Sequence, residues 1–388
     1  MKNPKWILAI IVIAQFCGIS LWFAGNGVLD DLRANFDLSV QAVGHLTSAV
    51  QFGFISGTLL FAIFTIADRF SPSRVFFFSA LVAGICNLGL LWDGNTLWSL
   101  LITRFLTGFF LAGIYPVGMK ISADYFEKGL GKSLSFLVGA LVLGTALPHL
   151  LKSSTFFSNW VWVIAATSGL AFLGGLIILL FVPDGPFRKR GNPFKLLAIF
   201  SIFRNPELKS AAFGYFGHMW ELYAFWAFIP VMLKTYQDLY GKALSISFWS
   251  FLIIGIGSIG CVVGGYVSQR FGVKRTAFWS LLLSCLCCLL SPFFFYIPYE
   301  TIFLGFLLFW GMVVISDSPL FSTMVANNAD SVLKGSALTL VNCIGFAITI
   351  FSIQLLNYLQ INFSPTSMYT ILAIGPILGL WALNRKRT

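Results

Sequence analysis

Two apolar runs joined by a short charged loop decide the fold of this chain. Residues 42–92 read AVGHLTSAVQFGFISGTLLFAIFTIADRFSPSRVFFFSALVAGICNLGLLW. The runs 42–66 and 75–92 are each about 20 residues long, the length at which a helix crosses a bilayer core of about 30 Å. The loop from Asp68 to Arg74 carries three charged side chains. This stretch therefore predicts two membrane-spanning helices that are joined at one side of a membrane.

Runs of the same kind recur along all 388 residues of the chain. Apolar side chains make up 58% of the sequence and charged ones 10%, whereas an ordinary soluble domain has about 25% charged residues. This composition excludes a large soluble catalytic or nucleic-acid-binding domain. It predicts an all-α membrane protein with 12 transmembrane helices, at residues 6–29, 42–66, 75–92, 96–119, 131–151, 159–182, 210–233, 244–268, 275–295, 299–326, 335–358 and 364–383.

The longest hydrophilic interruption divides the twelve spans into six and six. It covers residues 183–209, and its Pro, Gly and basic residues are typical of a linker along a membrane surface. We therefore predict an N-terminal six-helix bundle over residues 1–182, a cytoplasmic linker over 183–209 and a C-terminal six-helix bundle over 210–388. Within the linker we expect a short amphipathic helix at Phe194–Phe203.

The two bundles show weak sequence repetition. The loop Asp68–Arg74 matches Gln269–Arg275, 201 residues later, at Arg, Phe and Arg. Two further pairs keep nearly the same offset: Tyr115-Pro116 with Ser318-Pro319, and Gly131 with Gly335. Because the matches stay in register around a central linker, they indicate duplication into two pseudo-symmetric six-helix bundles. In transporters this arrangement places the substrate site at the repeat interface, near the membrane midplane.

The net charge of +11 is explained by how Lys and Arg are distributed between the two sides of the membrane. With a cytoplasmic N-terminus, 20 of the 25 Lys and Arg residues fall inside, four fall outside and Arg104 lies within a span. The positive-inside rule predicts this bias when both termini are cytoplasmic. We therefore expect no nucleic-acid partner. The run 6–29 is longer than the apolar region of a signal peptide, so we interpret it as an uncleaved first span.

Motifs of enzymes and metal sites are missing from the sequence. Gly131-Lys132-Ser133 resembles the end of a phosphate-binding loop, but Phe126 stands where that loop requires glycine. The seven cysteines lie within spans, and the cluster Cys285–Cys288 has no His or carboxylate neighbour in the sequence that would complete a metal site. We therefore expect no metal, no cofactor and no enzymatic activity, and an ion gradient rather than ATP as the energy source.

Four ionisable side chains lie away from the ends of the predicted spans, namely Arg104, His218, Glu221 and Asp317, whereas His45 and His149 lie near outer ends of spans and are interpreted as interfacial. A charge at this depth costs several kcal/mol unless it is paired or hydrated, so each of the four is a candidate for substrate binding or proton coupling. From the rise of 1.5 Å per residue, Arg104 and Glu221 lie at levels close enough to pair across the two halves. His218 shares a helix face with Glu221 and lies near the level of Asp317. We predict a ladder of these four groups, with histidine as the proton relay.

Structural alternatives for the same residues remain open at this stage. Arg104 is alternatively a packing element bonded to carbonyls and hydroxyls, with Glu221 as its static partner. His218 is alternatively a hydrogen-bonded histidine without a relay role. Asp317 precedes Ser318-Pro319, so its carboxylate is alternatively bonded to backbone groups loosened by the proline.

Neutral polar and aromatic side chains in spans 1, 2, 4 and 7 are candidates for the wall of a solute pocket. Aromatic walls with few polar groups suit a small organic or anionic solute. The candidates are Gln15, Trp22, Asn26, Gln51, Tyr115, Trp220 and Tyr223.

These elements together resemble the major facilitator superfamily (MFS) over essentially the whole chain. In that family the loop between spans 2 and 3 reads G-x-x-x-D-R/K-x-G-x-x-R/K. Asp68, Arg69 and Arg74 occupy the charged positions here, whereas Phe64 and Ser71 replace the two glycines. The second copy has Gln269 at the acidic position and keeps the others, Gly265, Arg270, Gly272 and Arg275.

Two shorter elements carry the same resemblance. Arg104-Phe-Leu-Thr-Gly108 is similar to the family's R-x-x-x-G element in span 4. Pro183-Asp184-Gly-Pro186-Phe-Arg188, which closes span 6, is similar to its P-E-S-P-R element. The resemblance implies the MFS fold, with spans 1, 4, 7 and 10 lining a central cavity. The four ionisable residues then fall on three of the four cavity helices.

The resemblance also implies a conformational gate at the cytoplasmic side. Charge clusters there are expected to latch the two halves together in the outward-open state. The residues at the matching charged positions are Asp68, Arg69, Arg74, Asp184, Arg188, Arg270 and Arg275.

For the function, we expect a proton-coupled secondary transporter that imports a small polar or anionic solute by alternating access. Arg104 is expected to attract the anion, while Glu221, with His218 or Asp317, exchanges the proton. Residues 217–224 resemble uptake permeases grouped with the cyanate and nitrate porters, and span 5 lacks the Gly-Pro pair common in antiporters of the family. The alternatives are a proton-coupled multidrug or metabolite exporter and a receptor with an MFS fold and no flux.

For the setting, the resemblance implies a monomer in the lipid bilayer of a bacterial inner membrane. Both termini are expected in the cytoplasm, and the partners are a small-molecule substrate and protons.

Overall fold

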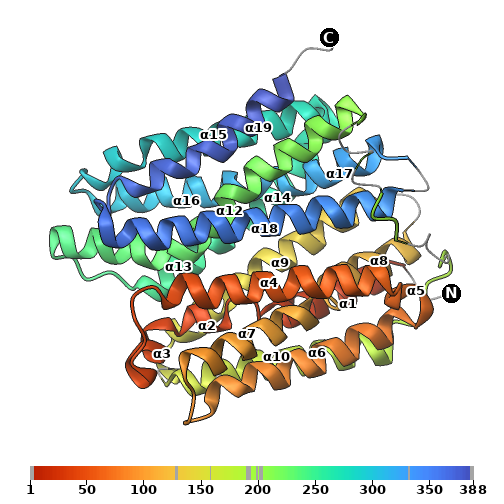
Figure 1. The fold of residues 1–388 in the computed structure, drawn as a ribbon, viewed down its shortest axis with the longest axis horizontal. Helices are drawn as coiled ribbons and strands as arrows, with labels where there is room; N and C mark the ends of the chain where they lie inside the picture. Colours follow the sequence, from red (N-terminus) through yellow and green to blue (C-terminus); the bar gives the residue numbers. More distant parts are fainter. Residues whose placement is uncertain are drawn as a thin grey trace. The chain divides into compact units, whose positions relative to one another are not determined.

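The chain folds almost entirely into helices. The computed structural model describes residues 4–126, 130–157, 159–188, 194–197, 200, 204–330 and 333–384, and these contain no β-strand (Figure 1). The chain divides into two compact units, Met1–Lys195 and Leu196–Thr388. Much of the amphipathic helix predicted at Phe194–Phe203 falls outside the described residues, so it stays a prediction.

The first unit holds the six N-terminal spans, several of them as two consecutive helices. Span 1 is α1 followed by α2, and span 4 is α7 followed by α8. The elements in order are α1 (Pro4–Ile19), α2 (Ala24–Gly27), α3 (Leu29–Phe36), α4 (Ala42–Ile63), α5 (Ile66–Arg69), α6 (Pro72–Leu88), η1 (Gly89–Leu91), α7 (Leu97–Leu111), α8 (Tyr115–Tyr125), α9 (Leu130–Ser153), η2 (Thr155–Phe157) and α10 (Trp160–Phe181).

The second unit repeats this pattern with a longer first helix. Span 7 is the continuous helix α12, and span 10 is α16 followed by α17. The elements are α12 (Pro206–Tyr240), α13 (Ile246–Gly255), α14 (Gly257–Phe271), α15 (Val273–Phe295), α16 (Glu300–Ser316), α17 (Ser318–Asn328), α18 (Lys334–Asn362), η3 (Met368–Ala373) and α19 (Ile374–Asn384).

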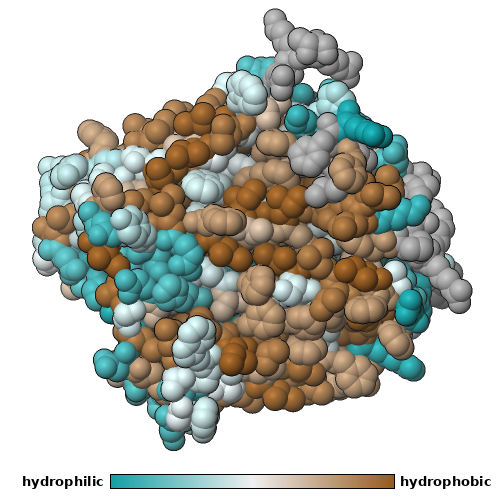
Figure 2. All heavy atoms as spheres, in the orientation of Figure 1, coloured by the Kyte–Doolittle hydropathy of each residue, from teal (hydrophilic) through white to brown (hydrophobic). Residues whose placement is uncertain are grey.

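The helices have the lengths and surfaces of membrane spans. Nine helical segments of the described residues are long and apolar enough to cross a bilayer, and two shorter apolar segments, Trp6–Ile19 and Met368–Asn384, lie at predicted spans 1 and 12. The remaining span is α12, which has 35 residues and carries His218 and Glu221. Apolar side chains cover the middle of the helices, and hydrophilic ones gather towards their ends (Figure 2). The predicted all-α membrane fold is confirmed.

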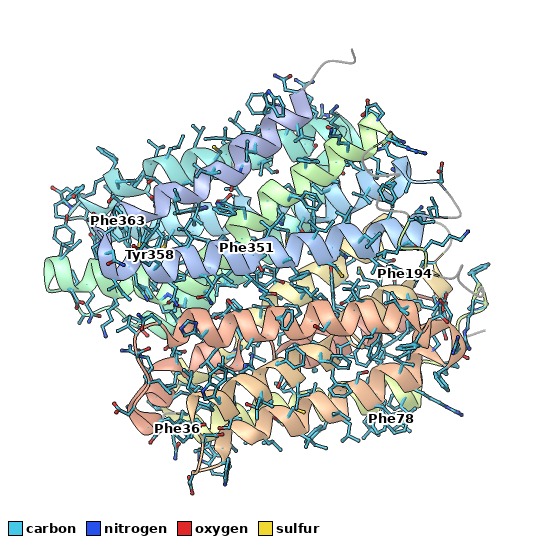
Figure 3. All side chains as sticks on the ribbon, in the orientation of Figure 1. Phe36, Phe78, Phe194, Phe351, Tyr358 and Phe363 are labelled. Atoms are coloured by element: carbon cyan, nitrogen blue, oxygen red, sulfur yellow. The ribbon has the colours of Figure 1, made fainter. Side chains whose placement is uncertain are left out.

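Large aromatic side chains project from the outer faces of these helices. Phe78 on α6 and Phe351 and Tyr358 on α18 each have more than half of their surface exposed (Figure 3). A surface of this kind suits contact with lipid tails.

Two helix breaks begin at the prolines that the sequence repeat aligns. Pro116 is the second residue of α8 and Pro319 the second residue of α17. Proline lacks the N–H of a continuous helix and clashes with the carbonyl four residues earlier, so each span is interrupted just before it. The interruption in span 10 is at Asp317, which joins α16 to α17.

Glycine contacts show the duplication in three dimensions. Gly57 on α4 lies against the carbonyl of Phe109 on α7, and Gly260 on α14 lies against the carbonyl of Met312 on α16. A second pair of contacts has the same pattern: Gly108 against Val50, and Gly311 against Ile253. Each residue in the second unit follows its counterpart by 203 positions. The two units therefore use the same close contact between equivalent spans.

Candidate functional site

Arg104 lies in the core of the first unit, where it is 1% exposed. Its Nη1 donates to Oδ1 of Asn87 at 3.1 Å. Its Nη2 donates to the carbonyls of Leu21 at 3.1 Å and Trp22 at 2.5 Å. Both carbonyls belong to the turn between α1 and α2, so the guanidinium of α7 holds the point at which span 1 is interrupted.

Asn87 extends this network to the last span of the first unit. Its Nδ2 donates to the hydroxyls of Ser168 at 3.0 Å and Thr167 at 3.3 Å, both on α10. Among the described residues, Arg104 forms no ion pair with a carboxylate. The geometry matches the packing alternative for Arg104, whereas pairing with Glu221 and anion binding stay predictions.

His218 and Asp317 meet in the interior of the second unit. Nδ1 of His218 on α12 lies 2.8 Å from Oδ1 of Asp317, and both side chains are 1% exposed. The rings of Tyr215 and Phe321 flank the imidazole at centroid distances of 5.9 and 6.2 Å. Nε2 of His218 makes no hydrogen bond to the described residues, whereas the backbone N–H groups of Asp317 and Ser318 lie near the carboxylate of Asp317. The pair therefore links α12 to the break in span 10 and keeps one imidazole nitrogen available.

Glu221 lies one turn along α12 from His218, and both oxygens of its carboxylate accept hydrogen bonds. Trp310 on α16 donates its Nε1 to Oε1 at 2.6 Å, and the Ser284 hydroxyl on α15 donates to Oε2. The carboxylate is 1% exposed. Both of its oxygens thus accept hydrogen bonds from neighbouring spans, which fixes the side chain in place.

The predicted pocket residues of span 7 pack within the second unit. Trp220 donates its Nε1 to the carbonyl of Ile371 in η3 at 3.3 Å. The ring of Tyr223 lies 5.3 Å from that of Phe346 on α18. These contacts give both side chains a packing function, and their place in a pocket stays a prediction.

The predicted pocket residues of the first unit fall into two groups. Asn26 donates to the Thr47 hydroxyl at 2.8 Å, and the Trp22 ring lies 4.8 Å from that of Phe54. Tyr115 is the first residue of α8. Gln15 and Gln51, by contrast, are fully buried, and neither amide makes a hydrogen bond to the described residues.

Charged residues meet at one end of the first unit. Lys120 on α8 pairs with Asp68 at 2.7 Å. Arg188 pairs with Asp184 and also donates to the carbonyl of Phe70 at 2.8 Å. The structure thus brings together Asp68, Asp184 and Arg188, and their role in a gate stays a prediction. The remaining residues of the predicted gate are exposed, namely Arg69, Arg74, Arg270 and Arg275.

Sequence reasoning missed several partners in these clusters. Lys120 is a basic residue just after predicted span 4 and lies one turn before Asp124, which is the one signal for it in the sequence. Asn87, Ser284 and Trp310 are neutral, and their types are common in membrane spans. A search restricted to ionisable residues does not find them, although an asparagine in the middle of an apolar run is itself a weak signal.

Two units of membrane-spanning helices, built on one repeat and carrying buried charged or titratable side chains, define a polytopic transport protein. The chain belongs to the Major Facilitator Superfamily, whose family model matches residues 11–353. The expectation that the protein is a transporter and not an enzyme is confirmed by this membership.

Individual relatives are distant. The chain is 22% identical over 327 residues to the putative transporter AraJ of Escherichia coli, covering 81% of this chain and 78% of AraJ. A bacterial homologue of the human lysosomal transporter Spinster, inward-facing and unoccupied, superposes with a TM-score of 0.70 at 15% identity over 99% of this chain and 95% of that one. The proton:xylose symporter XylE bound to 6-bromo-6-deoxy-D-glucose gives a TM-score of 0.75 at 15% identity over 98% and 95%. These structures support the fold.

Proposed function

We propose that this protein is a proton-coupled secondary transporter that takes up a small polar solute by alternating access. We place it as a monomer in a bacterial inner membrane with both termini in the cytoplasm, following the distribution of Lys and Arg. The observation that carries the proposal is the buried contact of 2.8 Å between His218 and Asp317. The fold shared with a proton:xylose symporter supports coupling to protons.

The His218–Asp317 pair has the properties that a coupling site requires. The charged form of the pair ties α12 to the break between α16 and α17. Protonation of Asp317 removes its charge and weakens this tie, so proton occupancy changes the contact between two spans. A ligand that changes such a contact shifts the balance between conformations. His218 Nε2, which has no hydrogen-bond partner among the described residues, gives the proton a place to enter or leave.

Glu221 is the competing position for the coupling proton. Its two oxygens already accept hydrogen bonds from Trp310 and Ser284, so the structure favours a fixed carboxylate at this place. We therefore assign the proton to His218 and Asp317 first. Arg104 is engaged within its own unit, so the proposal does not require an anionic solute.

The test compares three variants of the reconstituted protein: Asp317→Asn, His218→Gln and Glu221→Gln. Metabolites are first added to wild-type proteoliposomes that contain a pH-sensitive dye, and a solute that causes proton influx is then used radiolabelled. We expect Asp317→Asn and His218→Gln to abolish gradient-driven accumulation while exchange at equal concentrations survives. Glu221→Gln is expected to keep accumulation.

Three results would contradict the proposal. If accumulation is lost in Glu221→Gln alone, Glu221 and not the His218–Asp317 pair exchanges the coupling proton. If transport by the wild-type protein does not depend on the pH gradient, transport is not coupled to protons. If the solute moves only against the direction of proton flow, the protein is an exporter.

A further inference from the structure

The duplicated units differ at one equivalent position of their first spans. His218 follows Gln15 by 203 residues, the spacing of the shared glycine contacts, and Asp317 follows Ile114 by the same number. His218 lies beside Asp317, at the break of span 10. Gln15 lies beside Gly118, one turn after the break of span 4 at Ile114. The same place thus holds a titratable pair in one unit and a neutral amide in the other.

The Gln15 amide has no hydrogen-bond partner among the described residues. Its side chain is 0% exposed, and both Nε2 and Oε1 are unpaired. Gln51 on α4 has the same properties. The Ser122 hydroxyl, one turn beyond Gly118 on the same helix, is also buried and unpaired. The side chains of α1, α4 and α8 therefore bury several neutral polar groups without satisfying them.

Asn87 shows how a structural amide is held in the same unit. It is equally buried, yet its Nδ2 donates to two hydroxyls and its Oδ1 accepts from Arg104. A buried polar group without a partner is unfavourable, more so inside a bilayer where water is scarce. An amide that is kept under this cost is explained when it meets a partner during the working cycle.

The unpaired groups also define the chemistry of that partner. An amide donates and accepts hydrogen bonds but carries no charge, so it matches hydroxyl and amide groups. An anion needs a compensating positive charge when it is buried. The buried arginine of the first unit directs its Nη donors to Asn87 and to backbone carbonyls. The first unit therefore favours an uncharged solute.

We propose that Gln15 binds the transported solute, and that this solute is a neutral molecule bearing hydroxyl or amide groups. The inference rests on the proposed function, in which His218 and Asp317 exchange the proton. The equivalent positions of the two units then have different functions: Gln15 binds the solute in the first unit, and His218 with Asp317 exchanges the proton in the second.

The first test needs no knowledge of the solute. We compare the thermal unfolding of Gln15→Met, Gln51→Met and Asn87→Leu in detergent without added ligand. Replacing an unpaired buried amide by an apolar side chain of similar shape is neutral or stabilising, so we expect Tm to be unchanged or to rise by about 1–3 °C in the two Gln variants. Asn87→Leu is expected to lose several degrees. A fall in Gln15→Met as large as in Asn87→Leu overturns the proposal, because Gln15 then has a structural partner.

The second test identifies the class of solute. A library of neutral polyhydroxy and amide compounds, carboxylates, phosphates and amines is screened for an increase in the Tm of the wild-type protein, since a bound ligand stabilises the native state. We expect stabilisation by neutral members only, with the shift lost in Gln15→Met and kept in Glu221→Gln. Stabilisation by anions alone, by no neutral member, or unchanged in Gln15→Met overturns the proposal.

The outcomes separate this inference from the proposed function. A neutral solute that depends on Gln15 for binding but enters vesicles without protons leaves the inference intact and removes proton coupling. An anionic solute that accumulates in response to the pH gradient supports proton coupling and overturns the inference of a neutral solute.

Discussion

At the scale of single residues, the partners of a buried polar side chain decide what it does. Arg104, Glu221 and Gln15 are all nearly or fully buried. Arg104 and Glu221 have donors or acceptors from neighbouring spans, whereas the Gln15 amide has none among the described residues. Satisfied groups stabilise the packing of helices, whereas a buried group without a partner needs another explanation, which we propose to be a ligand in the case of Gln15. The chemical type of the residue alone does not separate these cases.

The substitution Arg104→Lys tests whether the hydrogen bonds of Arg104 stabilise the first unit. Lysine keeps the charge but has one ammonium group, which cannot reach both Asn87 and the two carbonyls of the α1–α2 turn. We expect the free energy of unfolding to fall by roughly 1–3 kcal/mol, because buried polar groups lose their partners. Thermal unfolding in detergent measures this loss. An unchanged Tm combined with loss of solute affinity would instead make Arg104 a ligand of the solute.

At the scale of helices, close contacts and breaks determine how the spans pack. Gly57 brings α4 against the backbone of α7, and Gly260 repeats the contact between α14 and α16. Breaks at Pro116 and Pro319 end the first half of spans 4 and 10. Small residues let helix backbones approach each other, which is a main source of stability between helices in a membrane. The two features together explain why equivalent spans meet in both units.

A pair of glycine variants tests this account. A Cβ at Gly57 would meet the backbone of α7, whereas a Cβ at Gly169 on α10 meets nothing within 4 Å. Gly57→Ala is expected to destabilise the protein by roughly 1–3 kcal/mol through overpacking. Gly169→Ala is expected to be neutral or stabilising by up to about 1 kcal/mol, because alanine favours the helix. Equal Tm values for the two variants would contradict the close contact between α4 and α7.

At the scale of the whole molecule, the two units have equivalent helices but different chemistry. The buried contact of His218 with Asp317 occurs in the second unit, and its counterpart positions in the first hold Gln15 and Ile114. The pairing of Asp68 with Lys120 and of Asp184 with Arg188 occurs in the first unit. In the second unit Gln269 replaces the acidic residue that corresponds to Asp68. After duplication, the two units have therefore kept equivalent helices but acquired different side chains at equivalent positions.

This asymmetry predicts the stoichiometry of coupling. With the His218–Asp317 pair as the proton site, each cycle is expected to move one proton and, for a neutral solute, one positive charge. A tenfold solute gradient should then be balanced by a membrane potential of about 59 mV at equal pH. Reversal of labelled solute flux in vesicles with imposed potentials measures this value. A balance point near half of it would indicate two protons and a second site.

The sequence by itself determined the class, the span positions and the repeat. Spans 42–66 and 75–92 agree with α4 and with α6 plus η1, because apolar length and local proline chemistry are properties of consecutive residues. It also singled out Arg104, His218, Glu221 and Asp317, since a charge in an apolar run is visible without a structure.

Only the tertiary structure decided which of these side chains meet and which are satisfied. Asn87, Ser284 and Trp310 come from other spans, up to 89 residues away from the groups they bind. Hydrogen bonds act over about 3 Å and depend on which helix faces turn towards each other. Side-chain packing between distant segments sets those faces, and the order of residues along one span does not specify it.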